Sequence, residues 1–109
     1  MNPILSHLEN GVLTLTLNRV EKKNSLTSTM YAELAQALDS AQTDTQTKVV
    51  LMQGHETVFS AGNDIADFLK QPASGEDSPV FRFLRGLALF PKPLIASVCG
   101  PAVGIGTTL

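Results

Sequence analysis

The amino-acid sequence predicts an α/β fold in which parallel strands alternate with helices. Residues 12–17 alternate Leu with Thr or Val, which is the period-two pattern of a strand with one buried face. Apolar residues then recur at helical spacing over 27–41, and the segment 48–52, which is continuously apolar after Lys48, predicts a second, more deeply buried strand. Because this order of elements is typical of a right-handed crossover, we expect the two strands to be parallel.

Size and composition favour one globular domain over residues 1–109, with 43% hydrophobic and 17% charged residues. The net charge is -2 and the basic residues are scattered, with Lys22 and Lys23 as the only adjacent pair, so we expect no nucleic-acid partner. A single cysteine, Cys99, excludes an internal disulfide and fits a reducing compartment. Since no signal peptide is visible, we expect a cytoplasmic protein.

The first helix has both a start signal and an apolar face. After a polar loop at 18–26, Thr27 or Thr29 can act as the N-cap by accepting a free backbone N–H. The helix should then run through about Ala41. Its apolar face consists of Met30, Leu34 and Leu38, flanked by Tyr31 and Ala35.

The second half of the chain predicts two further helices and a third strand. Asp64 can cap a short helix through residue 69, because its carboxylate accepts free N–H groups. Residues 71–79 are rich in Pro, Ser, Gly and acids, which favours a flexible surface loop. A helical pattern resumes over 80–90, and the apolar run 94–98 predicts a third buried strand.

The end of the sequence is apolar but interrupted. Residues 93–109 carry no charge, yet prolines and glycines break the run, which favours buried strand and loop over a membrane helix. An apolar, helix-like pattern begins at Thr107 and has no cap before Leu109. We therefore expect the native polypeptide to continue past Leu109 and this domain to be incomplete.

Two glycine-bearing loops, 59–65 and 100–106, follow apolar strand-like runs. Glycine lets the backbone turn and leaves N–H groups pointing outward, and two such donors converging on one point would form an oxyanion hole. For either loop alone, Gly62 or Gly104 could equally serve only the turn. Nucleotide-binding loops are disfavoured, because no Lys follows Gly106 and neither loop reads G-x-G-x-x-G.

Three motifs, taken in order, closely resemble the enoyl-CoA hydratase/isomerase (crotonase) family. They are Leu17-Asn18-Arg19 with Lys23-Asn24-Ser25-Leu26, the loop 59–65, and Lys92-Pro93-Leu94-Ile95-Ala96 running into 100–106. The resemblance covers nearly the whole chain. It implies the N-terminal part of a crotonase-like ββα spiral, forming a homotrimer or hexamer when full length and acting on acyl-CoA thioesters. No separate cofactor is implied, since coenzyme A is part of the substrate.

The same resemblance implies the site residues. Two backbone N–H groups would hold the thioester oxygen, and by motif position they belong to Asn63 and Ile105. A backbone donor tolerates either side chain. The implied coenzyme A contacts are Lys22, Lys23, Ser25, Leu26, Ser60, Ala61, Gly62 and Gly104. For the two lysines, the alternative of solvated surface charges stays open.

The departures from the family pattern favour one reaction. Family hydratases carry a catalytic Glu two residues after the last motif glycine, where this chain has Thr108. The resemblance therefore favours Δ3,Δ2-enoyl-CoA isomerisation, which uses one carboxylate from farther along the chain. No residue before Leu109 matches that base, and capping accounts better for Asp64. Hydration, or a non-catalytic acyl-CoA-binding homologue, are the alternatives.

Other chemistry finds little support in the sequence. A nucleophilic Cys99 would need a base, and His7 and His55 lie in segments without an activating pattern, so we expect Cys99 in the core. His55 should lie in a turn. Metal ligands do not occur at suitable spacing, so we expect no metal site.

Overall fold

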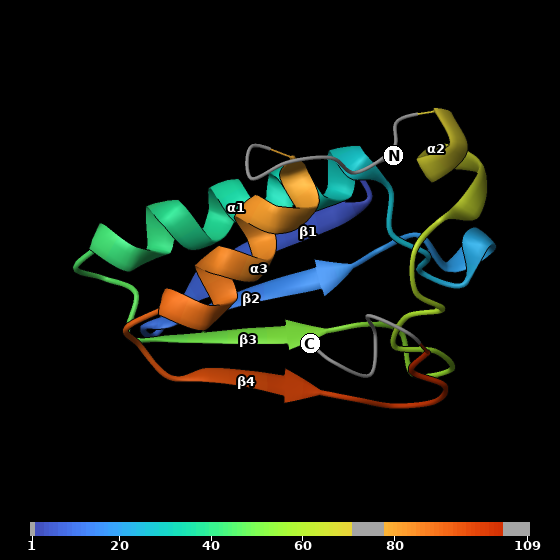
Figure 1. The fold of residues 1–109 in the computed structure, drawn as a ribbon. Coiled ribbons are helices and arrows are strands. Elements are labelled where there is room, and N and C mark those ends of the chain that lie inside the picture. The colour runs from blue at the N-terminus through green and yellow to red at the C-terminus, as the bar shows by residue number, and fades with distance from the viewer. Residues whose placement is uncertain (1, 71–77, 104–109) are drawn as a thin grey trace.

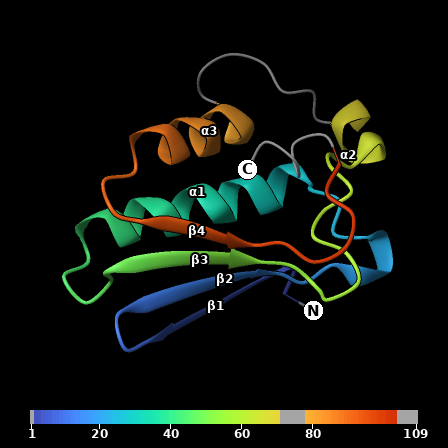
Figure 2. The same ribbon diagram turned by 90° about the horizontal axis from the view of Figure 1, so that it is seen from below.

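The computed structural model describes residues 2–70 and 78–103, which form a four-stranded sheet with two helices over one face (Figures 1 and 2). The sheet order is β1 (Ile4–Glu9), β2 (Val12–Leu17), β3 (Val49–Gln53) and β4 (Leu94–Ser97). Strands β1 and β2 are antiparallel, whereas β2, β3 and β4 are mutually parallel. The predicted α/β class and the parallel pairing of 12–17 with 48–52 are confirmed.

Strand β1 is an element that the sequence patterns above do not include. It joins β2 through the two-residue turn Asn10-Gly11, whose φ angles are 52° and 82°. A tight hairpin turn of this kind needs positive φ at both central residues, which Asn and Gly tolerate best. The Asn-Gly pair was therefore the available signal for β1.

Helix α1 (Ser28–Thr43) agrees with the predicted helix and ends two residues beyond Ala41. Thr27 is its N-cap, because the Thr27 Oγ1 accepts the N–H of Met30 at 3.2 Å. The predicted apolar face is fully buried against the sheet. This face fixes the rotation of α1 and places Tyr31 in the core as well.

Helix α3 (Pro79–Leu89) packs beside α1 on the same face of the sheet (Figure 1). Ser78 caps it, and Pro79 occupies the first turn, where its missing N–H costs nothing. The predicted loop over 71–79 is therefore wrong for Pro79, which begins the helix, while 71–77 lie outside the described residues. The Phe83 ring is buried and lies 5.6 Å from the Tyr31 ring, tilted by 56°.

The strands β3 and β4 are less buried than predicted. In β3 only Val50 and Met52 are buried, because the helices cover a single face and strand side chains alternate between faces. All four residues of β4 are exposed, with Ile95 at 53%, since β4 pairs only with β3 among the described residues. Cys99 is exposed too, so its placement in the core was wrong.

Lys92 anchors the start of β4 to the end of α1. Its Nζ donates to the carbonyl oxygens of Ala41 at 2.6 Å, Asp44 at 2.7 Å and Thr47 at 2.7 Å. These three bonds use all three donors of the ammonium group, and its positive charge lies at the favourable end of the helix dipole. The contact therefore holds the connection from α3 to β4 in place.

Candidate functional site

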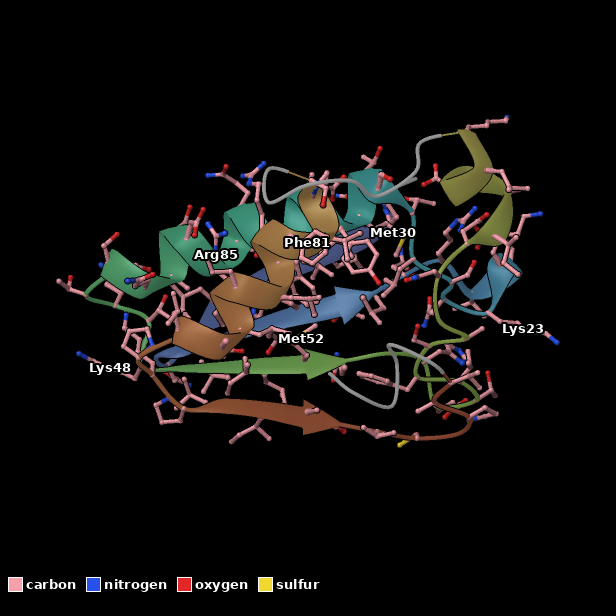
Figure 3. The ribbon with its side chains drawn as sticks, viewed as in Figure 1. Lys23, Met30, Lys48, Met52, Phe81 and Arg85 are labelled. Atoms are coloured by element: carbon pink, nitrogen blue, oxygen red, sulfur yellow. The ribbon has the colours of Figure 1, made fainter. Side chains whose placement is uncertain are left out.

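The candidate site lies where the loops that follow β2, β3 and β4 meet. Figure 1 shows these parallel strands pointing toward the same end of the molecule, and Figure 3 places Lys23 there. Ligands of open α/β sheets bind at this carboxyl end of the strands. The short 3-10 helix η1 (Val20–Lys22) and the predicted loop 59–65 both belong to this region.

Asn24 joins the first two loops and is completely buried. Its Oδ1 accepts the N–H of Arg19 at 2.7 Å, and its Nδ2 donates to the Phe59 carbonyl at 3.2 Å. The Ser60 Oγ donates to the Asn24 carbonyl at 2.9 Å and accepts the N–H of Gly62 at 3.1 Å. Because these polar groups are all satisfied internally, Asn24 and Ser60 form a framework for the loop.

Asn63 presents a backbone N–H that the fold leaves available. The Leu26 N–H donates to the Gly62 carbonyl at 2.8 Å, and the Leu26 carbonyl accepts the N–H of Asp64 at 2.8 Å. In such a parallel bridge the central residue directs its own N–H away from its partner. Within residues 2–70 and 78–103, the Asn63 N–H meets no acceptor, and Asn63 is exposed. It is therefore able to donate to a ligand.

Asp64 is a structural carboxylate. Its Oδ1 accepts the Asp67 N–H at 2.9 Å at the start of α2 (Ile65–Lys70), and its Oδ2 accepts from Arg19 Nη1 at 2.8 Å. The Asp67 N–H and then the Arg19 guanidinium hold the pKa of Asp64 below its usual range. The predicted capping role is confirmed. A proton-transfer role is disfavoured, because both carboxylate oxygens already accept hydrogen bonds and the lowered pKa makes the carboxylate a weaker base.

Tyr31 reaches the site from the core, a link that the sequence alone did not predict. Its hydroxyl donates to Asn63 Oδ1, and burial raises the pKa of Tyr31 to about 12. The phenol is therefore a neutral donor at ordinary pH. Since Tyr31 is the only tyrosine and lies beside an apolar helical face, its need for a hydroxyl partner was the available signal.

A hollow of about 610 Å³ adjoins this loop. Its lining residues are Val20, Lys23, Thr57, Val58, Ala61, Pro101 and Val103. The exposed Lys23 has a left-handed backbone with φ 55°, and its carbonyl accepts the Ala61 N–H at 3.0 Å. Because Ala61 lines the hollow and lies two positions before Asn63, the Lys23 cation and the apolar walls border the loop that carries Asn63.

The other predicted contact residues fall into distinct groups. Lys22 is exposed beside Lys23, whereas Leu26 is buried and contributes backbone groups. Ser25 accepts from Arg19 Nη1 through its Oγ at 3.0 Å and its carbonyl at 3.1 Å. Gly62 has a φ of 92°, which suits glycine at the turn. Gly104 and Ile105 lie outside the described residues.

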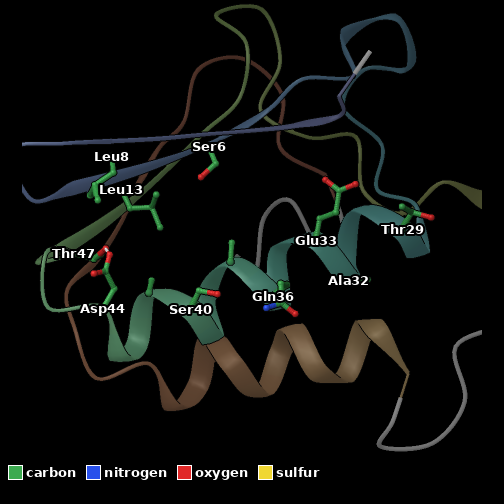
Figure 4. Close-up of a pocket in the computed structure, with 12 residues that line it drawn as sticks. Ser6, Leu8, Leu13, Thr29, Ala32, Glu33, Gln36, Ser40, Asp44 and Thr47 are labelled. Carbon is green, nitrogen blue, oxygen red and sulfur yellow. Dashed lines mark hydrogen bonds between the residues drawn. The ribbon is translucent and has the colours of Figure 1, made fainter.

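A larger hollow of about 650 Å³ lies between α1 and the strands β1 and β2 (Figure 4). Its charged lining residues are Glu33 and Asp44, and no Lys or Arg is among them. Two carboxylates without a cation disfavour a phosphate-bearing ligand. None of the predicted contact residues lines this hollow, so the site is assigned to the loops.

Rival chemistry is also unsupported by the described part of the chain. No cluster of His, Cys, Asp and Glu in 2–70 or 78–103 is suited to hold a metal ion. His55 Nδ1 accepts the Thr57 N–H at 3.1 Å within a turn, as predicted for that segment. Among these residues, no helix has the length and apolar character needed to cross a membrane.

The sequence is similar to those of curated proteins that are named as acyl-CoA isomerases and hydratases. Curated relatives include 1,2-epoxyphenylacetyl-CoA isomerase of Escherichia coli (strain K12), which is 42% identical over 100% of this chain and 44% of that protein. Enoyl-CoA delta isomerase 2 of Rattus norvegicus is 39% identical over 97% of this chain and 28% of that protein. Hydratase names also occur among the relatives. The chain thus spans less than half the length of these relatives.

The fold is also similar to those of solved structures. The structure of Pseudomonas aeruginosa OdaA has a TM-score of 0.95 and 56% sequence identity, covering 99% of this chain and 44% of that chain. Residues 7–109 match the family model described as enoyl-CoA hydratase/isomerase. Because that model covers nearly the whole sequence, the chain belongs to the enoyl-CoA hydratase/isomerase family, and its sheet and helices are part of a crotonase fold.

Proposed function

We propose that this chain is part of an enzyme that binds an acyl-CoA thioester and stabilises its enolate with the Asn63 N–H. The observation that carries the proposal is the bridge to Leu26, which leaves that N–H without an acceptor among the described residues. A fixed donor aimed at a developing oxyanion is worth several kcal/mol, because it needs no reorganisation during the reaction. Ile105 is assigned the second N–H by motif position.

Coenzyme A is assigned to the hollow beside this donor. Lys22 and Lys23 would supply positive charge to its phosphates, and the apolar walls would contact its less polar parts. The internal hydrogen bonds of Ser60 favour a contact through the backbone of its neighbour Ala61 over one through the serine hydroxyl. We also propose that the whole protein is cytoplasmic and forms a homotrimer or hexamer.

Double-bond isomerisation is the favoured reaction. A base removes a proton from C2 of a 3-enoyl thioester, and the electron pair delocalises onto the thioester oxygen. The double bond then re-forms between C2 and C3, and a proton is delivered to C4. Asp64 is held by its cap and by Arg19, so the base is assigned to another part of the whole protein. The names of two relatives support isomerisation.

Hydration is the second candidate, because a relative named 2,3-dehydroadipyl-CoA hydratase is 34% identical over the whole chain. The two reactions have opposite optical signatures. Isomerisation of trans-3-hexenoyl-CoA creates a conjugated thioester and raises the near-ultraviolet absorbance, whereas hydration of trans-2-hexenoyl-CoA removes conjugation and lowers it.

The test uses the full-length natural gene product with both substrates. A rise with the 3-enoyl ester and no fall with the 2-enoyl ester is the expected result. A fall with the 2-enoyl ester alone would replace isomerisation by hydration. Tight binding of both esters without any change in absorbance would leave a non-catalytic acyl-CoA-binding protein. Failure to bind either ester would overturn the proposal.

A further inference from the structure

The peptide unit that carries the candidate donor is held at its two ends by different partners. The N–H of Asn63 belongs to the peptide between Gly62 and Asn63. At one end, the Gly62 carbonyl accepts from the Leu26 N–H at 2.8 Å. At the other end, the Asn63 side chain accepts from the Tyr31 hydroxyl through Oδ1.

The first of these restraints does not fix the peptide unit by itself. Gly62 precedes the unit with a φ of 92°, and glycine permits rotations that other residues resist. The Leu26 bridge holds the Gly62 carbonyl and the Asp64 N–H on either side of Asn63, and the peptide unit between these two bonds can still tilt. A second restraint, at the Asn63 side chain, limits this tilt, and it therefore limits the direction of the N–H.

Tyr31 is well suited to supply that second restraint. Its ring is 0% exposed and packs against Phe83, so the hydroxyl has a fixed origin in the core. The helix that carries it is itself held near its start, because the Asp67 carboxylate accepts the Ser28 N–H at 2.8 Å. A rigid donor loses little conformational entropy when it makes its bond.

The packing of the ring does not account for the hydroxyl. Phenylalanine would fill the same space, and burying a hydroxyl costs free energy that only a hydrogen bond offsets. Burial accordingly raises the pKa of Tyr31 to about 12. The hydroxyl donates to the exposed Asn63, and Asn63 carries the available backbone donor.

We propose that Tyr31 is a positioning residue: by donating to Asn63 Oδ1, its hydroxyl sets the direction of the Asn63 backbone N–H toward the thioester oxygen. This inference rests on the proposed function, since it concerns the enolate-stabilising donor. Tyr31 itself does not touch the substrate. Loss of its hydroxyl should weaken binding of the enolate far more than binding of a neutral thioester.

The test compares Tyr31→Phe with Thr47→Val in the full-length protein. Thr47 is the matched control, because its buried hydroxyl also donates to a side-chain oxygen, that of Asp44 at 2.8 Å, but at the opposite end of α1. Two probes separate the charge states of the ligand. Calorimetry with butyryl-CoA measures the affinity for a neutral thioester. The near-ultraviolet absorbance of bound acetoacetyl-CoA measures its enolate-to-keto ratio.

We expect Tyr31→Phe to bind butyryl-CoA within about twofold of wild type and to lower the bound enolate-to-keto ratio by about threefold or more. Its kcat should fall by a similar factor with little change in KM. Thr47→Val should leave the ratio unchanged. Asn63→Ala should match Tyr31→Phe, and the double variant should be no worse than either, because both changes cut the same link.

The outcomes separate the two ideas. If wild type fails to raise the enolate ratio above that of free acetoacetyl-CoA, the proposed function and this inference both fall. If wild type raises it and Tyr31→Phe does so equally, only the positioning role is overturned. The same conclusion follows if Thr47→Val lowers the ratio as much as Tyr31→Phe, because the effect would then come from stability alone.

Discussion

Arg19 and Asp64 lie 45 positions apart in the sequence and form an ion pair with 2.8 Å between Nη1 and Oδ2. Both side chains are largely buried, and the same Nη1 also donates to Ser25. The pair therefore connects the loop after β2 to the loop that carries Asn63. Its removal should affect stability and site geometry together.

Arg19→Met should lower the free energy of unfolding by about 2 kcal/mol, because it leaves Asp64 and the Ser25 carbonyl without a charged donor. Arg19→Lys should recover part of this loss, since an ammonium group restores the charge but not the forked geometry. Urea denaturation measures both values. Equal stability of wild type and Arg19→Met would contradict the role assigned to the pair.

Acid should destabilise the protein through Asp64 and Asp44. The pKa of Asp64 is lowered by the Asp67 N–H and by Arg19, and that of Asp44 by the Thr47 hydroxyl and the Gln46 N–H. A carboxyl whose folded pKa is depressed stabilises the fold above its unfolded pKa, and this contribution is lost as pH falls through the folded value. Stability should therefore be level above about pH 5 and decline below about pH 4.

Asp64→Asn should flatten this decline when unfolding is measured in urea across the acidic range. Asp39→Asn is the control, because Asp39 lies on the exposed side of α1 and its carboxylate has no hydrogen-bond partner within 2–70 and 78–103. An equally steep decline in Asp64→Asn and wild type would show that another group governs acid unfolding.

Gly100→Ala should be strongly destabilising. Gly100 has a φ of 73°, and an added Cβ would lie 2.3 Å from the Thr57 carbonyl oxygen, which cannot move freely. We expect a loss of about 2 kcal/mol or more in thermal denaturation. Gly86→Ala is the matched control, because its Cβ would lie 3.5 Å from Leu38 within a helix, and it should be neutral or stabilising by up to about 1 kcal/mol.

Lys92→Met should cost about 2–3 kcal/mol, because it leaves three carbonyl oxygens without their charged donor. Lys48→Met removes an exposed cation from the same end of the molecule and should change stability by less than about 0.5 kcal/mol. Comparable losses for the two variants in urea denaturation would show that the three bonds contribute little.

If Asn63 and Ile105 act through their backbone N–H groups, Asn63→Ala and Ile105→Pro should affect the turnover of the complete enzyme very differently. Asn63→Ala keeps its N–H, so turnover should stay within about tenfold, whereas Ile105→Pro removes an N–H and should cost about 10²-fold or more. Circular dichroism must confirm that Ile105→Pro folds. A folded Ile105→Pro enzyme with a near-normal rate would exclude the oxyanion role of that residue.

Local patterns predicted the local structure well. Helix α1 follows from the spacing of Met30, Leu34 and Leu38, and Thr27 and Asp64 cap their helices as their chemistry suggests. These outcomes depend on neighbours within a few residues, which the sequence displays directly. The hairpin partner β1 was missed although Asn10-Gly11 carried its signal.

Burial and long-range contacts were harder to predict. Cys99 and the run 94–98 are apolar enough for a core, but exposure depends on which elements cover them. The bond from Tyr31 to Asn63 spans 32 positions and has no local pattern at all. Motif resemblance identified Asn63, but it could not identify the side chain that restrains it.

The loop that carries Asn63 has its observed shape only when residues 19–26 pack against residues 58–64. The hydrogen bonds of Arg19, Asn24 and Leu26 make this contact. A ligand that accepts from the Asn63 N–H therefore binds the folded chain, in which these two segments are in contact, and not the unfolded chain. When the contact between the two segments breaks, the chain gains conformational entropy, and ligand binding opposes this unfolding. By mass action, such a ligand must raise the melting temperature of the whole domain as its concentration increases.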